Sequence, residues 1–258
     1  MSAAYDTYDY PSYWKGRQYE HQAEVYALRN LLNKIPSCAR ALEIGAGFGR
    51  LVPEYELKAK EVIISDPSSK LLSIAKNKSH SKRIKFIKSS LENLDKKIRT
   101  RSVDLVILVR VLHHLQNTQE AFRVINRILV PGGYFILEFP NKVNFKASIR
   151  ELFRGNITYP IDISSKEIRS KTKRREPCLP FYNYHPDKIR LLLGNANFSV
   201  IENASVSNIR STHIKKILPT KVLMFLEKPL QRLLAPFDFG PSVFILAQKK
   251  RVIPDYIS

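Results

Sequence analysis

The sequence predicts an α/β protein built on a doubly wound, mostly parallel sheet of seven strands. Three observations predict this class. Short runs that are apolar almost throughout alternate with segments whose apolar residues recur at helical spacing, a pattern typical of a parallel sheet covered on both faces. The chain has 258 residues, 44% of them hydrophobic, so it can bury a large core. Right-handed crossovers between successive strands then wind such a sheet in two directions.

Seven apolar runs predict the strands. In chain order they read ALEIG, EVIISD, KFIKSS, VDLVILVRV, YFILEFP, NFSVIENASV and SVFILAQKK. Each is short and rich in aliphatic or aromatic residues, as buried strands are. The first five alternate with helical patterns, so they predict the parallel part of the sheet, and the last two complete it.

Helices are predicted where apolar residues form stripes. Such stripes occur in five segments: 23–32, 51–57, 67–78, 119–129 and 187–193. Pro36 ends the first. The sequence PGG at 131–133 is expected to close the fourth, because glycine accepts the left-handed conformation of many helix ends. Two short helices separated by Pro229 are expected in 214–235.

The domain organisation is predicted from the segments in which the alternation of strand and helix patterns is absent. Residues 1–35 are expected to form an N-terminal lid and helix, and residues 36–258 the sheet domain. Cap insertions are expected at about 141–185 and 209–238, the first of which is basic and irregular in sequence.

The charge of the chain is strongly positive. Lys and Arg number 43 against 23 Asp and Glu, a formal net charge of +20. This excess indicates either a solvated basic surface or an anionic partner, such as nucleic acid or a membrane surface. The basic residues are not interleaved with aromatic ones as in a nucleic-acid module, which favours the first reading. Residues 214–235 combine basic and apolar residues. This pattern is compatible with peripheral contact to a membrane or with a helix packed on its own domain.

Cysteine usage and the N-terminal sequence bear on the compartment. Cys38 and Cys178 lie far apart and in no metal-like spacing, which argues against a disulfide scaffold or a zinc module. The N-terminus lacks the pattern of a signal peptide, and no apolar run approaches the length of a membrane span. A cytoplasmic protein without a metal site is therefore expected.

A glycine-rich bend after the first strand carries the functional signal. Gly45, Gly47 and Gly49 follow Glu43. A dinucleotide fingerprint has its third glycine one residue later, where Arg50 stands, and a P-loop needs Gly-Lys-Ser/Thr. The carboxylate of Glu43 would repel a pyrophosphate and attract a cation.

Asp66 ends the second predicted strand, so it is expected at the same edge of the sheet as the bend. A carboxylate there can accept hydrogen bonds from both hydroxyls of a ribose, or it can cap the following helix. The glycines allow close approach of an amino-acid moiety, and backbone N–H groups at a helix start can meet its carboxylate. S-adenosylmethionine is a cation that has all these parts.

Four motifs in this order, LEIGAGFG, IISDPS, SVDLVILVRVLHHL and LVPGGYFILEFPN, resemble the class I S-adenosylmethionine-dependent methyltransferases and, within them, the small-molecule branch that includes quinone methyltransferases. The resemblance covers about residues 38–140 well and the last two strands more loosely. It implies a Rossmann-like domain with the ribose on Asp66 and the adenine against Pro67 and Ser90. Ser90 stands where the family often has aspartate. The implied cofactor residues are Glu43, Gly45, Ala46, Gly47, Gly49, Asp66, Pro67, Ser90, Leu91 and Val109.

The acceptor side is expected to lie beyond the fourth strand. The resemblance implies that His114 faces the active site, where it is the candidate general base; alternatively, the histidine pair packs the next helix. The other candidate substrate contacts are Tyr13, Arg17, His113, Tyr184 and His185, for most of which ordinary packing is the alternative.

The leading hypothesis is methyl transfer from S-adenosylmethionine to a small-molecule acceptor by in-line displacement. Two alternatives remain open at this point. One is an RNA or protein methyltransferase that uses the basic surface. The other is a non-catalytic module that binds nucleotide-like ligands.

Overall fold

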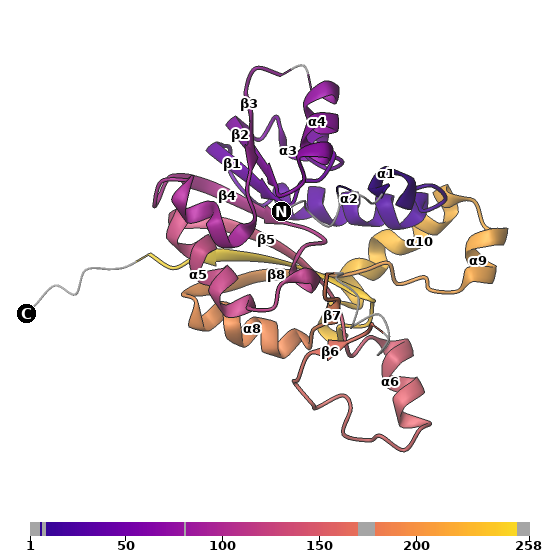
Figure 1. Cartoon of the computed structure of the whole chain (residues 1–258). Coiled ribbons are helices and arrows are strands. Elements are labelled where there is room, and N and C mark those ends of the chain that lie inside the picture. The colour runs from indigo at the N-terminus through magenta and orange to yellow at the C-terminus, as the bar shows by residue number, and fades with distance from the viewer. Residues whose placement is uncertain (1–5, 7–8, 80, 170–178, 252–258) are drawn as a thin grey trace, which may run out of the picture.

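The computed structural model describes residues 6, 9–79, 81–169 and 179–251. Part of the predicted lid (1–5 and 7–8) and part of the predicted basic insertion (170–178) lie outside the described residues. Figure 1 shows a central sheet with helices on both faces. The main strands are β1 (Cys38–Ile44), β2 (Ala59–Asp66), β3 (Ile84–Lys88), β4 (Val103–Leu108), β5 (Leu129–Pro140), β8 (Phe198–Val206) and β9 (Ser242–Lys249).

The predicted seven-stranded, mostly parallel sheet is confirmed. Its strand order is β3-β2-β1-β4-β5-β9-β8. β9 runs antiparallel to both of its neighbours, whereas the pairs among β1 to β5 are parallel. The order reverses direction at β1, between β2 and β4. In such sheets the ligand site lies beyond the carboxyl ends of the strands at that reversal.

The helices follow the predicted stripes. They are α1 (Tyr10–Tyr13), α2 (Gln18–Leu32), α3 (Val52–Tyr55), α4 (Ser69–Lys78), α5 (Thr118–Ile128), α6 (Phe145–Leu152), α8 (Pro186–Asn195), α9 (Thr212–Ile217) and α10 (Thr220–Leu233). Short 3-10 helices are η1 (Leu91–Lys96), η2 (Leu112–His114) and η3 (Ala235–Phe237). Polar side chains begin several helices: Ser68 accepts from the Leu71 N–H at α4, and Asn117 accepts from the Glu120 N–H at α5, which satisfies otherwise unpaired N–H groups.

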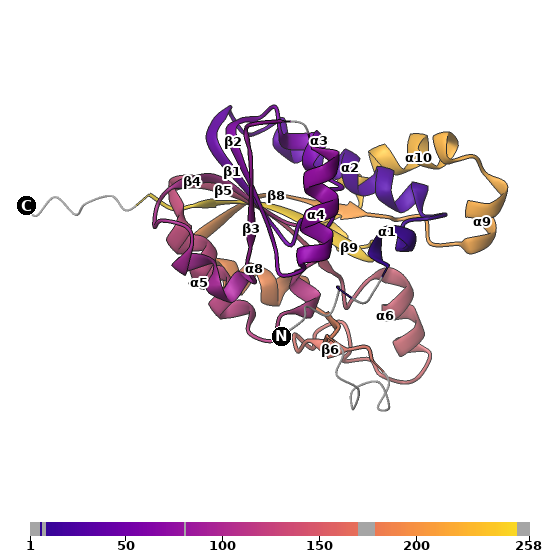
Figure 2. The same ribbon diagram turned by 45° about the horizontal axis from the view of Figure 1, so that its top comes forward.

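Two cores lie on opposite faces of the sheet. In β4 the side chains of Leu105 and Ile107 pack in one core with α2, α3, α4 and α10, while Val106 and Leu108 pack in the other with α5 and α8. This alternation follows from the two-residue period of a strand. Figure 2 shows α5 and α8 on one side of the sheet and α2, α4 and α10 on the other. Both faces of β4 are covered, which explains why its sequence is apolar throughout.

Some predicted boundaries were wrong. PGG does not close α5; the chain turns extended at Leu129, and residues 131–133 lie inside β5. Pro229 does not separate two helices but lies inside α10, and the break falls before it at Leu218 and Pro219. A proline inside a helix frees the carbonyl four residues earlier. That residue is Phe225, on the exposed side of α10, where solvent can satisfy the carbonyl.

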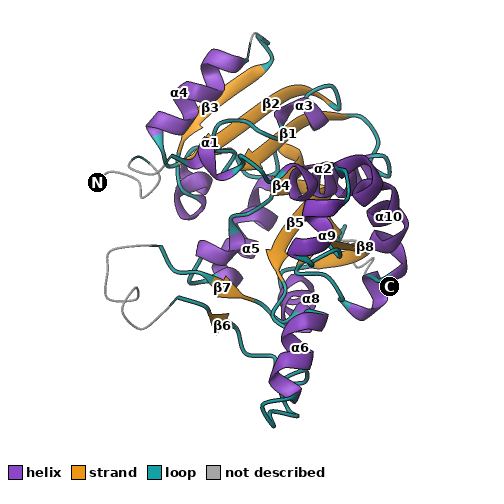
Figure 3. Cartoon of the chain, turned by 90° about the vertical axis from the view of Figure 1, so that its right-hand side faces the viewer, coloured by secondary structure: helices purple, strands orange, loops and turns teal. Residues whose placement is uncertain are grey.

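The insertion after β5 is more regular than its sequence predicts. It contains α6 and a two-stranded antiparallel ribbon of β6 (Lys166–Glu167) and β7 (Tyr182–Asn183). Asn141, directly after β5, bridges to Tyr184, directly after β7. Figure 3 shows the ribbon and α6 beyond one end of the main sheet. We call residues 141–169 and 179–185 the cap. Within the described ranges, no helix is both long and apolar enough to cross a bilayer.

Candidate functional site

The glycine bend between β1 and α3 is held in a left-handed backbone conformation. Gly45 has φ +69° and Gly47 has φ +55°, values that side chains other than glycine rarely adopt. A Cβ atom added to Gly45 would lie 2.3 Å from Cγ2 of Val111. The bend can therefore approach the loop after β4 only because its residue 45 lacks a side chain.

Alanine at position 45 is expected to destabilise the protein by more than its backbone strain alone, which costs about 1–2 kcal/mol. The added methyl group must also displace Val111. Gly155→Ala is the matched control, because Gly155 has φ +80° and open space around its Cβ position. Equal losses in the free energy of unfolding, measured by urea denaturation of both variants, would contradict the steric argument.

Asp66 joins this bend to α4. One carboxylate oxygen accepts from the Gly47 N–H at 2.9 Å, and the other accepts from the Ser68 N–H at 2.8 Å. The cap of α4 is Ser68, not Asp66, so the capping role considered for Asp66 belongs to its neighbour. Burial raises the pKa of the Asp66 carboxyl. Each oxygen receives one hydrogen bond in these contacts and has lone-pair capacity for a second.

A cavity of about 300 Å³ opens beside this carboxylate, at the carboxyl ends of β1, β2 and β4. The structure brings together in its wall six of the ten predicted cofactor residues, namely Gly45, Gly47, Asp66, Pro67, Ser90 and Leu91. The wall also contains Ser89, directly after β3, and Glu92, in the first turn of η1. It does not contain Glu43, Ala46, Gly49 or Val109.

Glu43 faces away from this cavity, into the core beneath α3. Its carboxylate accepts a hydrogen bond from the Tyr55 hydroxyl at 2.5 Å. Burial raises the pKa of the Glu43 carboxyl to about 7. Val109 is likewise buried, in the core that contains α2, and its neighbours Arg110 and Val111 line the cavity instead. A direct cofactor role for Glu43 and Val109 stays a prediction.

Arg110 is a wall residue that the sequence reasoning missed. It adopts φ +60° two residues after the end of β4. Its backbone N–H donates to the Glu138 carboxylate at 2.8 Å, and its guanidinium donates to Glu24 at 2.8 Å and to the Tyr13 hydroxyl at 2.7 Å. The available signal was an arginine that interrupts the apolar run VILVRVL. The carboxylates that hold it come from distant segments and carry no local signal.

The N-terminal segment closes one side of the site through aromatic and ionic contacts. Tyr10 of α1 lines the cavity. Arg50 stacks over the Trp14 ring at 3.7 Å and pairs with Glu24 at 2.6 Å. Arg17 lies over the Tyr13 ring at 4.2 Å, and neither residue of this last pair is in the cavity wall. The predicted lid thus contacts the site through Tyr10, while Tyr13 acts on it through Arg110.

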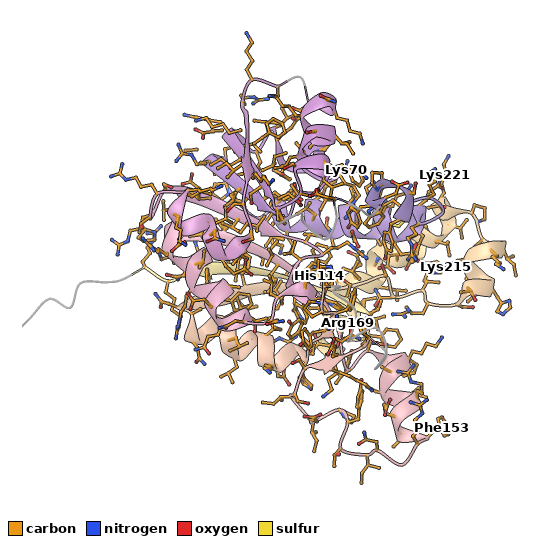
Figure 4. The ribbon with its side chains drawn as sticks, in the orientation of Figure 1. Lys70, His114, Phe153, Arg169, Lys215 and Lys221 are labelled. Atoms are coloured by element: carbon orange, nitrogen blue, oxygen red, sulfur yellow. The ribbon has the colours of Figure 1, made fainter. Side chains whose placement is uncertain are left out.

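The two histidines after β4 lie in different environments. His114 lines the cavity, and its Nδ1 donates to the carbonyl of Pro180 at 2.8 Å, so Nε2 is the basic nitrogen of the neutral ring. His113 is buried against Phe181, with ring centroids 4.3 Å apart. Burial lowers the pKa of both imidazoles, which keeps them neutral at pH 7. Figure 4 labels His114 where the sheet meets the cap.

Tyr184 and His185 hold the cap and do not line this cavity. The Tyr184 hydroxyl donates to the carbonyls of Leu112 and Leu115 at 3.2 and 3.0 Å. The His185 ring caps α8 through the Asp187 N–H and contacts the carbonyl of Pro160 at 2.8 Å. Their predicted substrate contacts remain untested. In the described part of the chain, no cluster of three His, Cys, Asp or Glu is placed to hold a metal ion.

Comparison with known proteins adds independent evidence. The methyltransferase-domain family matches residues 42–137. The yeast protein named "Probable S-adenosylmethionine-dependent methyltransferase CRG1", from Saccharomyces cerevisiae, is 32% identical over 161 residues, covering 60% of this chain and 52% of its own length. The tRNA 5-carboxymethoxyuridine methyltransferase of Escherichia coli K12 is 22% identical, covering 66% of this chain and 64% of its own. The chain thus spans about half the length of the yeast relative.

Solved structures agree on the fold. An S-adenosylmethionine-dependent methyltransferase from Mesorhizobium loti superposes with a TM-score of 0.58 at 18% identity, covering 88% of this chain and 98% of its own. A second such methyltransferase, from Archaeoglobus fulgidus, superposes with a TM-score of 0.57 at 17% identity. It covers 93% of this chain and 100% of its own. At these identities the likeness establishes the architecture, and the chemistry rests on the site.

Proposed function

We propose that the chain is a class I S-adenosylmethionine-dependent methyltransferase, as its methyltransferase domain and its relatives support, and that it transfers the methyl group of that cofactor to a small-molecule acceptor. One observation carries the proposal: the Asp66 carboxylate forms part of a cavity wall in which the residues of the glycine bend have no side chains to block close approach.

The residues of the wall fit the cofactor part by part. The Asp66 oxygens would accept from the two ribose hydroxyls while keeping their bonds to the bend and to α4. Pro67, Leu71 and Leu91 offer apolar surface to the adenine. Ser90 and Glu92 offer oxygens to its amino group. The bend at Gly45 and Gly47 would meet the amino-acid portion.

When bound, the cofactor supplies a methyl group on a sulfonium, a good leaving group for in-line displacement. The protein then has to orient the acceptor, exclude water and, where the nucleophile carries a proton, remove it. Tyr10 and the loop after β4 enclose the cavity, which limits solvent access. His114, which lines the cavity and is kept neutral by burial, would be the residue that accepts such a proton.

His114→Ala is expected to lower turnover about a hundredfold, as loss of a general base does, while cofactor affinity changes less than about threefold. His213, exposed on α9, provides the matched control. Turnover is measured as release of S-adenosylhomocysteine with a panel of small O-, N- and C-nucleophiles, and affinity by calorimetry. Unchanged turnover in His114→Ala would leave this residue a packing role only.

RNA is the second candidate acceptor, because a relative at 22% identity is named as a tRNA methyltransferase and this chain carries a net charge of +20. RNA binding through phosphates falls steeply with salt. Filter binding of a tRNA mixture at low and moderate salt tests this alternative. Absence of binding even at low salt would remove it.

A further inference from the structure

A second cavity lies beside the cap, at the same edge of the sheet as the first. Its volume is about 400 Å³, and it is enclosed by the end of β5, by α6, by the β6–β7 ribbon and by Arg210 in the segment between β8 and α9. None of its wall residues belongs to the wall of the first cavity. It is therefore a separate compartment that the cofactor site does not use.

The wall of this second cavity is strongly basic. It contains four cationic side chains, Lys146, Arg150, Lys166 and Arg210, and no aspartate or glutamate. Lys166 and Arg150 share the Glu151 carboxylate, at 3.3 and 3.9 Å. Lys146 and Arg210 make no hydrogen bond or ion pair with the described residues, although the charge of Glu20 attracts Arg210 from further away. The four cations are thus only partly compensated, and an anion in their midst would be stabilised.

Two neutral polar side chains of the wall, Asn144 and Tyr159, already make hydrogen bonds within the protein. The Asn144 amide donates to the carbonyl of Asn141 at 2.8 Å, and its oxygen accepts from the Ala147 N–H at 3.1 Å. The Tyr159 hydroxyl donates to the carbonyl of Lys142 at 2.9 Å. These bonds fix the wall, so the donors left for a ligand are chiefly the cationic ones. Such donors bind carboxylates and phosphates best.

Two contacts connect this cavity to the first. Glu138 of β5 holds the Arg110 N–H in the first cavity, and Pro140, two residues further along the strand, lines the second; two strand residues span about 7 Å. Phe181 packs its ring on His113, while its carbonyl accepts from the N–H of Ile168 at 2.9 Å, and Ile168 lines the second cavity. The two walls are therefore linked by short stretches of the same chain, and the two cavities lie near each other at this edge of the sheet.

We infer that the cavity between α6, the β6–β7 ribbon and Arg210 binds an anionic group of the acceptor, a carboxylate or a phosphate, while the end to be methylated lies near His114. This inference rests on the proposed function. It assigns the cap a role in substrate selection. It also explains part of the positive charge of the chain, because the cations of this cavity would bind the anionic group. An uncharged acceptor would leave these cations only partly compensated.

The test is calorimetric titration of the full chain with inorganic phosphate and, separately, with malonate, in the presence of S-adenosylhomocysteine. The double variant Lys146→Gln with Arg210→Gln is expected to bind either anion about a hundredfold more weakly, since each charged hydrogen bond contributes about tenfold. Because these two side chains make no polar contacts within the described ranges, the variant should fold normally. Comparison of the two anions shows which group the site prefers.

The matched control removes the same charge elsewhere. Lys60→Gln with Lys76→Gln lies on exposed positions of β2 and α4, and its anion affinity should stay within about threefold of the unmodified protein. Equal weakening in both double variants, or no weakening in either, would overturn the subsite. Tighter binding of a short single-stranded RNA than of either small anion, lost in the Lys146 and Arg210 variant, would overturn the small-molecule assignment.

The affinity for S-adenosylhomocysteine separates this inference from the proposed function. It should be the same in both double variants, because neither touches the first cavity. If the unmodified protein fails to bind S-adenosylhomocysteine, the methyltransferase proposal falls. If it binds this product while the anion affinities do not respond to the Lys146 and Arg210 changes, the subsite alone falls.

Discussion

Replacing Asp66 with alanine is expected to weaken the binding of S-adenosylmethionine by at least about a hundredfold. Two hydrogen bonds from ribose hydroxyls to a carboxylate would be lost, each contributing about 1.5–3 kcal/mol. The variant also removes the acceptors that tie the Gly47 N–H and the Ser68 N–H together, so the bend itself is expected to loosen. Both effects act in the same direction, which makes this one of the largest changes expected from a single substitution.

Calorimetry with S-adenosylmethionine and with its demethylated product measures this loss. Asp104→Ala is the matched control: Asp104 also accepts from a backbone N–H, that of Arg40 at 2.8 Å, but near the opposite ends of β1 and β4. The control should lose stability and keep its cofactor affinity. The cofactor affinity of Asp66→Asn is expected to lie between those of Asp66→Ala and Asp104→Ala. A folded Asp66→Ala protein with unchanged affinity would refute the assigned ribose contact.

Glu24→Gln is expected to lower the free energy of unfolding by about 3 kcal/mol, the loss typical when one partner of a buried ion pair is neutralised. Glu24 is 2% exposed and bridges Arg50 at 2.6 Å and Arg110 at 2.8 Å. Burial by itself would raise the pKa of Glu24, but the two guanidinium charges outweigh it and hold the pKa below its usual value. Neutralising this carboxylate leaves two cations with one fewer counter-charge.

Thermal and urea denaturation measure this effect. Glu120→Gln is the control, because Glu120 pairs with Arg123 on the surface, where both side chains are at least half exposed, and such a pair contributes at most about 1 kcal/mol. Cofactor affinity should also fall in Glu24→Gln, since Arg110 lines the cavity. Similar stabilities for the two variants would show that the bridge is dispensable.

The sheet could be predicted from the sequence because each of its signals is local. β4 is apolar throughout because both of its faces are covered, and Asp66 ends β2 as the motif order indicated. One boundary was wrong because a local preference did not decide the structure. PGG favours a helix end, yet it lies inside β5, in the irregular stretch between Leu129, which pairs with Val103 of β4, and Tyr134, which pairs with Leu105.

The site could be predicted only in part, for the same reason. Gly45, Asp66 and Pro67 belong to continuous motifs and line the cavity as expected. Arg110 was missed because its function depends on Glu24, 86 residues earlier in the chain, and on Glu138. The four cations of the second cavity come from α6, β6 and the segment after β8, and no periodicity relates them.

The position of β9 has a consequence for how the chain assembles. β9 follows β8 in the chain, yet it lies between β8 and β5. The half-sheet of β1 to β5, which contains the glycine bend and Asp66, can form as the chain emerges from the ribosome. β8 has no hydrogen-bonding neighbour until β9 has been synthesised. Pairing among β1 to β5 thus does not depend on β8 and β9, and a nascent chain halted before residue 242 would present an unpaired β5 to other strands.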